Sequence, residues 1–140
     1  MRFLLSFLLL GITLLTGCAT TNDHVLDAGD QTQLQKRSYQ SRTFETPDKE
    51  KVMRASISTL QDLGFVIDRA DLVLGSVSGT KVNTNQMIKI TVSTRPKGTD
   101  RMLVRANAQF NVTPIEDPKH YQDFFASLEK SLFLAAHAGE

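Results

Sequence analysis

The residue best placed for covalent chemistry is Cys18, the single cysteine of this 140-residue chain. It follows two small residues, Thr16 and Gly17, which come after an uncharged run of thirteen residues, FLLSFLLLGITLL (3–15). One cysteine excludes an internal disulfide and a multi-cysteine zinc site. Because a thiol is a good nucleophile, this position is a candidate for covalent modification.

The segment before Cys18 has the features of a secretory signal. Arg2 supplies a positive start, and an uncharged run of thirteen residues falls short of the roughly 20 apolar residues that a membrane-spanning helix needs. The sequence Leu15-Thr16-Gly17-Cys18 resembles the bacterial lipobox. The resemblance implies a signal peptide over 1–17, cleavage between Gly17 and Cys18, and attachment of acyl chains such as palmitate to Cys18. The alternatives are a buried N-terminal helix and an ordinary signal peptide with an incidental cysteine.

The same resemblance bears on location. Ala19 stands where lipoproteins of the inner membrane commonly carry Asp, which implies an outer-membrane lipoprotein whose domain faces the periplasm. The chain has 16 basic and 15 acidic residues, a near balance that argues against a nucleic-acid binder. Removal of 1–17 takes away Arg2 and leaves 15 of each. A neutral domain depends on its lipid for membrane attachment.

The residue patterns give no support to an enzyme. His24 lies among aspartates in a polar stretch, His120 lies near two aspartates at a helix start, and His137 lies near a helix end. No GxSxG or HExxH motif occurs, and the glycine-rich stretch 75–80 lacks the GK[ST] ending of a phosphate loop. We therefore expect neither catalysis, nor a metal site, nor a cofactor.

Basic side chains recur on one face of two expected strands. If Pro96-Lys97-Gly98 turns the chain into a hairpin, that face presents four cations between amide and hydroxyl side chains: Lys89, Arg95, Arg101 and Arg105 with Thr91, Asn107, Gln109 and Asn111. Such a face suits an envelope protein or an anionic glycan that carries carboxylates or phosphates. The alternative is a solvated face that keeps the sheet soluble.

A second hypothesis places an amphiphile between the helices and the sheet. Its lining would combine aromatic and sulfur-containing side chains: Phe124, Phe125, Phe133, Met53 and Met87. The alternative is that these residues form the core that a small domain needs.

The candidate residues named above must be positioned by strands, in which apolar and polar residues alternate, and by two amphipathic helices. Period-two patterns predict extended segments over 39–45, 65–69, 72–81, 87–95 and 101–112, with 65–81 bending near Ala70-Asp71. Apolar residues at helical spacing predict one helix over 47–63, capped by Thr46. They predict another that begins at Pro118, capped by Asp117 and running toward Gly139.

The element order predicts an α+β fold, a two-layer sandwich with an antiparallel sheet of about four strands and two helices on one face. This element order, together with the Leu63-Gly64-Phe65 turn, resembles that of the helix-grip domains of envelope lipoproteins such as the barrel-assembly lipoprotein family. The resemblance implies a partner-binding or structural role. We expect a lipidated cysteine and flexible tether over 18–38 and a single domain over 39–140.

Overall fold

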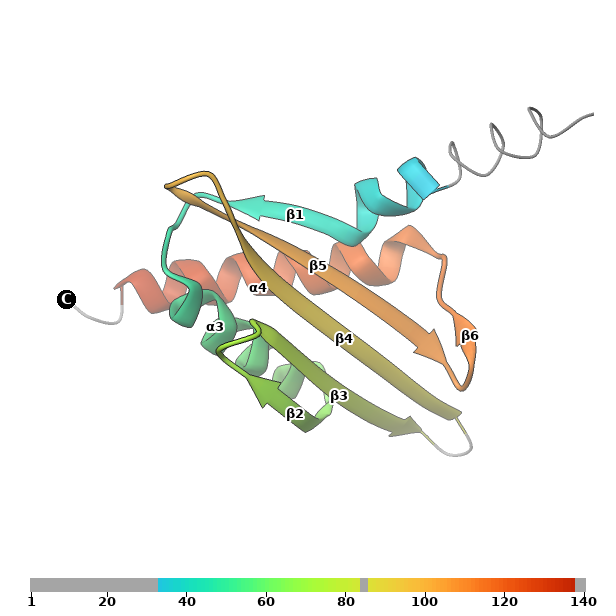
Figure 1. Ribbon diagram of the computed structural model, residues 1–140. Coiled ribbons are helices and arrows are strands. Elements are labelled where there is room, and N and C mark those ends of the chain that lie inside the picture. The colour runs from blue at the N-terminus through green and yellow to red at the C-terminus, as the bar shows by residue number, and fades with distance from the viewer. Residues whose placement is uncertain (1–32, 84–85, 138–140) are drawn as a thin grey trace, which may run out of the picture. The chain divides into compact units, whose positions relative to one another are not determined.

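The computed structural model describes residues 33–83 and 86–137, which belong to one compact unit, Gln33–Glu140. The described fold is α+β with an antiparallel sheet, as the sequence predicts (Figure 1). Residues 33–40 are helical, so the last part of the expected tether, 33–38, belongs to the folded domain. The proposed lipid attachment and residues 18–32 lie outside the described residues.

The sheet has six strands, not about four. Five follow the spatial order β1-β5-β4-β3-β2, and β6 pairs with β5 beside β1. The strands are β1 (Ser41–Phe44), β2 (Val66–Asp71), β3 (Ser76–Asn83), β4 (Gln86–Lys97), β5 (Arg101–Phe110) and β6 (Thr113–Pro114). All of the pairs are antiparallel, and β2 carries a bulge between Ile67 and Arg69. The sheet therefore ends in β2 at one edge and in β1 and β6 at the other.

Two differences in the chain's turns explain the larger sheet. The stretch 65–81 is not one bent segment, because a tight turn over 72–75 reverses it into the hairpin β2–β3. The strand expected over 101–112 ends at Phe110, where Asn111 takes a φ of 53° and turns the chain into β6. Asn111 therefore leaves the sheet face on which the sequence placed it, and Val112 is exposed rather than packed in the core.

Helix α3 (Lys49–Asp62) begins two residues later than expected. Asp48, not Thr46, is its N-cap, since Asp48 Oδ1 accepts from the backbone N–H of Lys51 at 2.9 Å. Thr46 Oγ1 instead accepts from the N–H of Asp48, at 3.3 Å. The helix ends at Asp62, with Leu63 as its C-cap, and the next residue is Gly64, where a φ of 83° suits glycine.

Helix α4 (Pro118–His137) confirms the expected terminal helix. The backbone N–H of Lys119 donates to Asp117 Oδ1 at 2.9 Å, in agreement with the predicted cap. Tyr121, Phe124, Phe125 and Leu128 then recur at the spacing of one helical face, and all four are buried.

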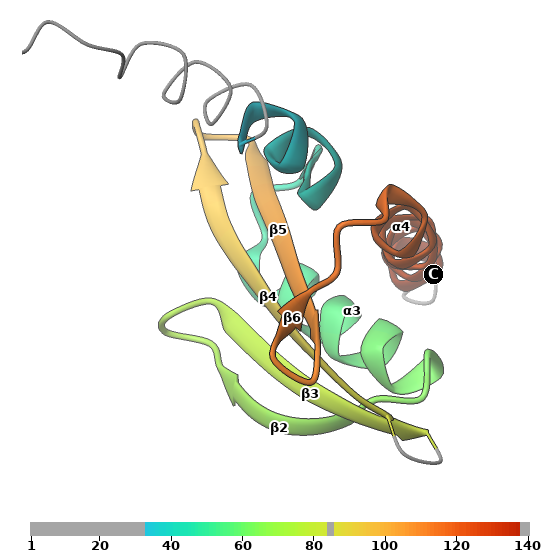
Figure 2. The ribbon, with the colours of Figure 1, turned by 90° about the vertical axis from the view of Figure 1, so that its right-hand side faces the viewer.

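The core lies between α3, α4 and one face of the sheet. Figure 2 shows both helices on the same side of the strands. Buried residues come from all of these elements, among them Met53 and Leu60 of α3, Val92 of β4 and Val104 of β5. The opposite face of the sheet is therefore the side that α3 and α4 leave open.

Candidate docking face

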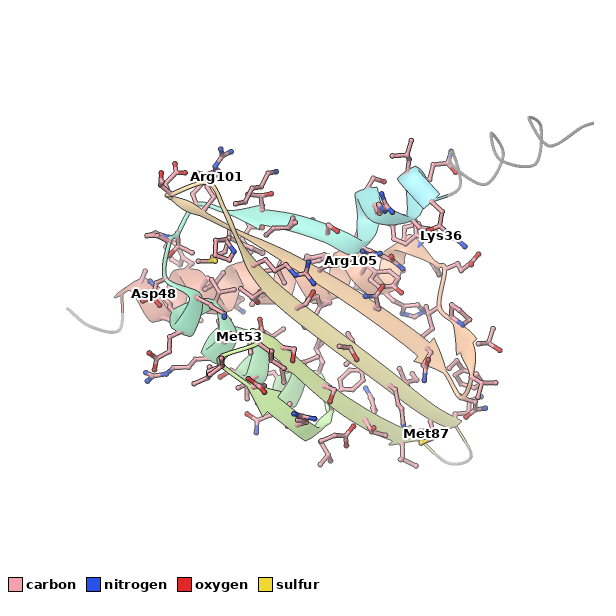
Figure 3. The ribbon with its side chains drawn as sticks, viewed as in Figure 1. Lys36, Asp48, Met53, Met87, Arg101 and Arg105 are labelled. Atoms are coloured by element: carbon pink, nitrogen blue, oxygen red, sulfur yellow. The ribbon has the colours of Figure 1, made fainter. Side chains whose placement is uncertain are left out.

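The hairpin β4–β5 puts the predicted cations on the open face of the sheet. The register pairs Lys89 with Gln109 and places Arg95 opposite Leu103, so the odd-numbered residues of both strands share one face. Val92 and Val104, in the opposite phase, are fully buried against the helices. Figure 3 looks onto the open face, with Arg101 beside the β4–β5 turn and Arg105 nearer the middle of β5.

Four of the cations on this face form what we call the cation cluster: Arg95, Lys97, Arg101 and Arg105. Lys97 lies directly opposite Arg101, and Arg95 lies opposite Leu103, the residue between the two arginines in that phase. Like charges directly opposite each other on neighbouring strands are destabilising. The sequence pattern predicts Lys97 in the turn Pro96-Lys97-Gly98. The signal that could have found it is the alternation of 89–95, which, continued by two residues, places Lys97 on the same face as Arg95.

The charges of the cation cluster are only weakly compensated within the described residues. Arg101 Nε lies 3.5 Å from Asp100 Oδ1, in a pair exposed to solvent, which screens the attraction. Lys97 Nζ donates to Thr43 Oγ1 at 3.2 Å, a neutral partner. The Nε atoms of Arg101 and Arg105 are both buried without a hydrogen-bond partner in the part of the chain that the structure describes. This end of the open face is therefore positively charged and has two donors that make no hydrogen bond.

Lys89 does not belong to that cluster, although the sequence grouped it there. It is six residues from Arg95 along β4, a separation of about 20 Å at the rise of a strand. It lines a shallow hollow of about 390 Å³ whose other polar side chains are Gln40, Asp68, Ser78, Thr91, Asn107 and Gln109. Asp68 Oδ2 accepts from Thr80 Oγ1 at 2.7 Å. The open face thus has a basic end and a mixed polar hollow.

A separate apolar slot of about 270 Å³ opens on the helix side of the sheet. Its lining comes from α3's end, the strands and α4: Leu63, Phe65, Lys81, Ile88, Ile90, Ala108, Ile115, His120, Tyr121, Asp123 and Phe124. Lys81 Nζ donates to the carbonyl of Leu63 at 2.8 Å. Of the residues predicted to line an amphiphile site, only Phe124 does so.

The other four residues of that prediction lie elsewhere. Met53 and Phe125 are buried in the core, whereas Met87 is partly exposed and Phe133 is 63% exposed. Figure 3 shows Met53 on α3 and Met87 near the start of β4. The predicted lining was wrong at these four positions because spacing along one element does not show which residues of other elements come beside it.

Within residues 33–83 and 86–137, the structure brings no candidate catalytic or metal-binding side chains together. His120 is exposed at the start of α4, and among the described residues there is no group of three or more metal-binding side chains. Cys18, His24 and the side chain of His137 lie outside what the structure describes. The helices within that part of the chain are all too short or too polar to cross a membrane.

No protein-family model matches the sequence, and no curated protein matches it either.

Proposed function

We propose that this chain is a lipid-anchored, non-catalytic envelope lipoprotein of the outer membrane. Its domain, a two-layer sandwich with α3 and α4 on one face of the sheet, acts in the periplasm as a partner-binding module. The anchor rests on Leu15-Thr16-Gly17-Cys18, and the binding surface is the open face of the sheet. The partner is an envelope protein or glycan that presents carboxylates or phosphates to the cation cluster.

The observation that carries this proposal is the cation cluster itself. Surface charges of both signs are normally interspersed, since that limits repulsion. Here Lys97 and Arg101 face each other across two paired strands, and Arg95 and Arg105 lie on the same surface. An arrangement that costs stability locally is expected where it serves binding. Arginines in such a group are suited to bidentate contact with an anionic partner.

Charge reversal tests the docking face directly. The variant Arg101→Glu/Arg105→Glu should lose most of its chemical cross-linking to its envelope partner in intact cells, because it turns attraction into repulsion. The matched control is Arg37→Glu/Lys130→Glu, which makes the same change in net charge on exposed helical positions outside the sheet. Equal cross-linking by the two variants would contradict a docking role for the open face.

The anchor has its own test. Cys18→Ser removes the thiol that would receive the lipid, so the chain should accumulate as an unprocessed precursor and lose the mass of its acyl chains. Mass spectrometry of the protein recovered from membranes measures both effects. Cleavage at Gly17 at the normal rate in this variant, or an unmodified mass for the natural protein, would contradict lipidation.

The apolar slot supports a second candidate function, the binding of an amphiphile. Its volume of about 270 Å³ is close to the lower end of the range for small-molecule sites, and most of its lining is apolar. A fluorescent fatty acid should bind, and Ala108→Leu, which fills the floor of the slot, should weaken binding about tenfold. Ala126→Leu, on the exposed side of α4, is the control. Equal binding by both variants would exclude the slot.

A further inference from the structure

The turn between β2 and β3 exposes three consecutive aliphatic residues. Leu72, Val73 and Leu74 are 49%, 87% and 68% exposed. Runs of exposed apolar residues are unfavourable in water and are expected only where they serve a function. Neither the cation cluster nor the apolar slot includes these residues. We call them the hydrophobic tip.

The hydrophobic tip is held in one conformation by contacts at its base. The backbone N–H of Leu74 donates to Asp71 Oδ1 at 2.8 Å, and Lys49 Nζ of α3 donates to the carbonyl of Val73 at 2.7 Å. Gly75 has a φ of 69°, and its carbonyl accepts from the N–H of Thr94 at 2.7 Å. These contacts fix the direction in which the tip projects, so its exposure is a built feature of the fold.

The chemistry of the tip favours lipid over protein. Interface positions that dominate protein binding are enriched in Trp, Tyr and Arg and poor in Leu and Val. The tip is purely aliphatic, and the ammonium group of Lys49 lies at its base. This combination matches the water–lipid boundary, where apolar groups enter the acyl region and a lysine reaches the headgroups. The carboxylate of Asp71 is partly offset by Arg69, whose Nη2 lies 3.7 Å away.

The geometry of the chain puts the tip within reach of a bilayer. The proposed attachment at Cys18 is separated from Gln33, where the described domain begins, by a segment that spans at most about 50 Å at full extension. The tip lies at the β2 edge, whereas the chain enters the sheet through β1 at the other edge. Five strands are about 20 Å wide, and the 12 residues of β4 are about 40 Å long. The tether is therefore long enough for the far edge to meet the same membrane.

We propose that the hydrophobic tip, Leu72-Val73-Leu74, inserts into the surface of the membrane that carries the lipid anchor. This inference rests on the proposed lipid anchor. The tip would give the domain a second contact with the bilayer and so a fixed orientation, which a single flexible attachment cannot supply.

Site-specific fluorescence tests the proposal, because Cys18 is the single natural cysteine and its thiol is blocked by the lipid. The variants Val73→Cys and Val112→Cys are labelled with a polarity-sensitive dye and inserted, as lipidated protein, into phospholipid vesicles with or without spin-labelled lipid. The two positions form a matched pair, since the valines are 87% and 88% exposed and both lie in turns. At position 73 we expect a blue shift in vesicles and a loss of about half of the emission or more with spin-labelled lipid, as for a dye at a depth of about 5–10 Å. At position 112 we expect little change.

Each other outcome contradicts the tip proposal. No lipid quenching at 73, or equal quenching at 73 and 112, would show that the tip makes no selective contact with the bilayer. A dye at position 73 that lipid does not quench in vesicles, together with a protein partner that cross-links to position 73, would assign the tip to protein binding. Failure of the anchor is distinguished by mass spectrometry of the natural protein. An unmodified mass would contradict the proposed lipidation, whereas an acylated mass without quenching at position 73 contradicts the tip alone.

Discussion

Two glycines with nearly the same backbone conformation differ in the space around them. Gly75 and Gly98 have φ values of 69° and 75°. A Cβ on Gly75 would lie 2.4 Å from the carbonyl oxygen of Thr94 and 2.7 Å from Cε of Lys49. At Gly98 the nearest atom to such a Cβ is Asp100 Oδ1, at 3.7 Å. The first turn is therefore packed against its neighbours and the second is open.

This contrast predicts different costs for the same substitution. Gly98→Ala should lower the free energy of unfolding by about 1–2 kcal/mol, the cost of a left-handed conformation for an L-residue. Gly75→Ala should lower the free energy of unfolding by about 1–3 kcal/mol more than Gly98→Ala does, since the backbone of β4 must move. Urea unfolding followed by circular dichroism measures both. Equal losses would show that the β2–β3 turn adapts freely.

At the scale of elements, the helix of residues 33–40 is held to the domain by few contacts. Lys36 Nζ lies 2.6 Å from Glu116 Oε1, and the rings of Tyr39 and Tyr121 are 5.3 Å apart at their centroids. The hydrogen bond to Glu116 raises the pKa of Lys36 above its usual 10.5. Lys36 therefore stays charged at neutral pH, and the contribution of the pair is lost as pH rises through that raised pKa.

Removal of the acidic partner should loosen this helix. Glu116→Gln should speed hydrogen exchange of the amides over 33–40 by about twofold to fivefold at neutral pH, as expected for an exposed ion pair. Glu129→Gln is the control, because Glu129 lies 3.5 Å from Arg42 of β1 and makes no contact with Lys36. The difference between wild type and Glu116→Gln should disappear in strongly alkaline buffer. Unchanged exchange at neutral pH would contradict this role for the pair.

The elements that the sequence predicted well are those with a long, regular pattern. Helix α4 and the β4–β5 hairpin follow from sustained spacing of apolar residues. The β2–β3 hairpin was missed because the alternation of apolar and polar residues continues across the turn. The reversal is held by a local contact of Asp71 with Leu74 and by a contact of Gly75 with the distant Thr94. The helix over 33–40 has no apolar periodicity and is stabilised by residues such as Glu116 that are far along the chain.

The candidate docking face was predicted in part for the same reason. Alternation alone placed Lys89, Arg95, Arg101 and Arg105 on one side of the sheet, and the register confirms that placement. Lys89 is six residues from Arg95 along one strand, but its separation from Arg101 and Arg105 follows only from the strand register. The hollow around Lys89 also needs Gln40, which is helical where the sequence predicted a strand, and Asp68, whose expected strand pairs in a hairpin that the sequence did not predict.

At the scale of the whole described domain, stability depends on one core shared by the sheet, α3 and α4. Leu128 is fully buried in that core, whereas Leu134, on the same helix, is 56% exposed. Leu128→Ala should lower the free energy of unfolding by about 3 kcal/mol, because it removes buried methyl groups and leaves a cavity. Leu134→Ala should change it by less than about 0.5 kcal/mol. Chemical denaturation measures the free energy of unfolding of both variants. Similar losses of stability in the two would place the core elsewhere.

The bulge in β2 affects how copies of this domain behave next to one another. An edge strand presents unpaired backbone groups that can pair with an edge from a second molecule. In β2 the bulge between Ile67 and Arg69 interrupts that row, and Asp68, Arg69 and Asp71 add charges of both signs. The proposed lipid anchor would confine copies to two dimensions, where encounters are frequent. The irregular edge disfavours the joining of neighbouring copies into a continuous sheet, and this protection would matter most on such a surface.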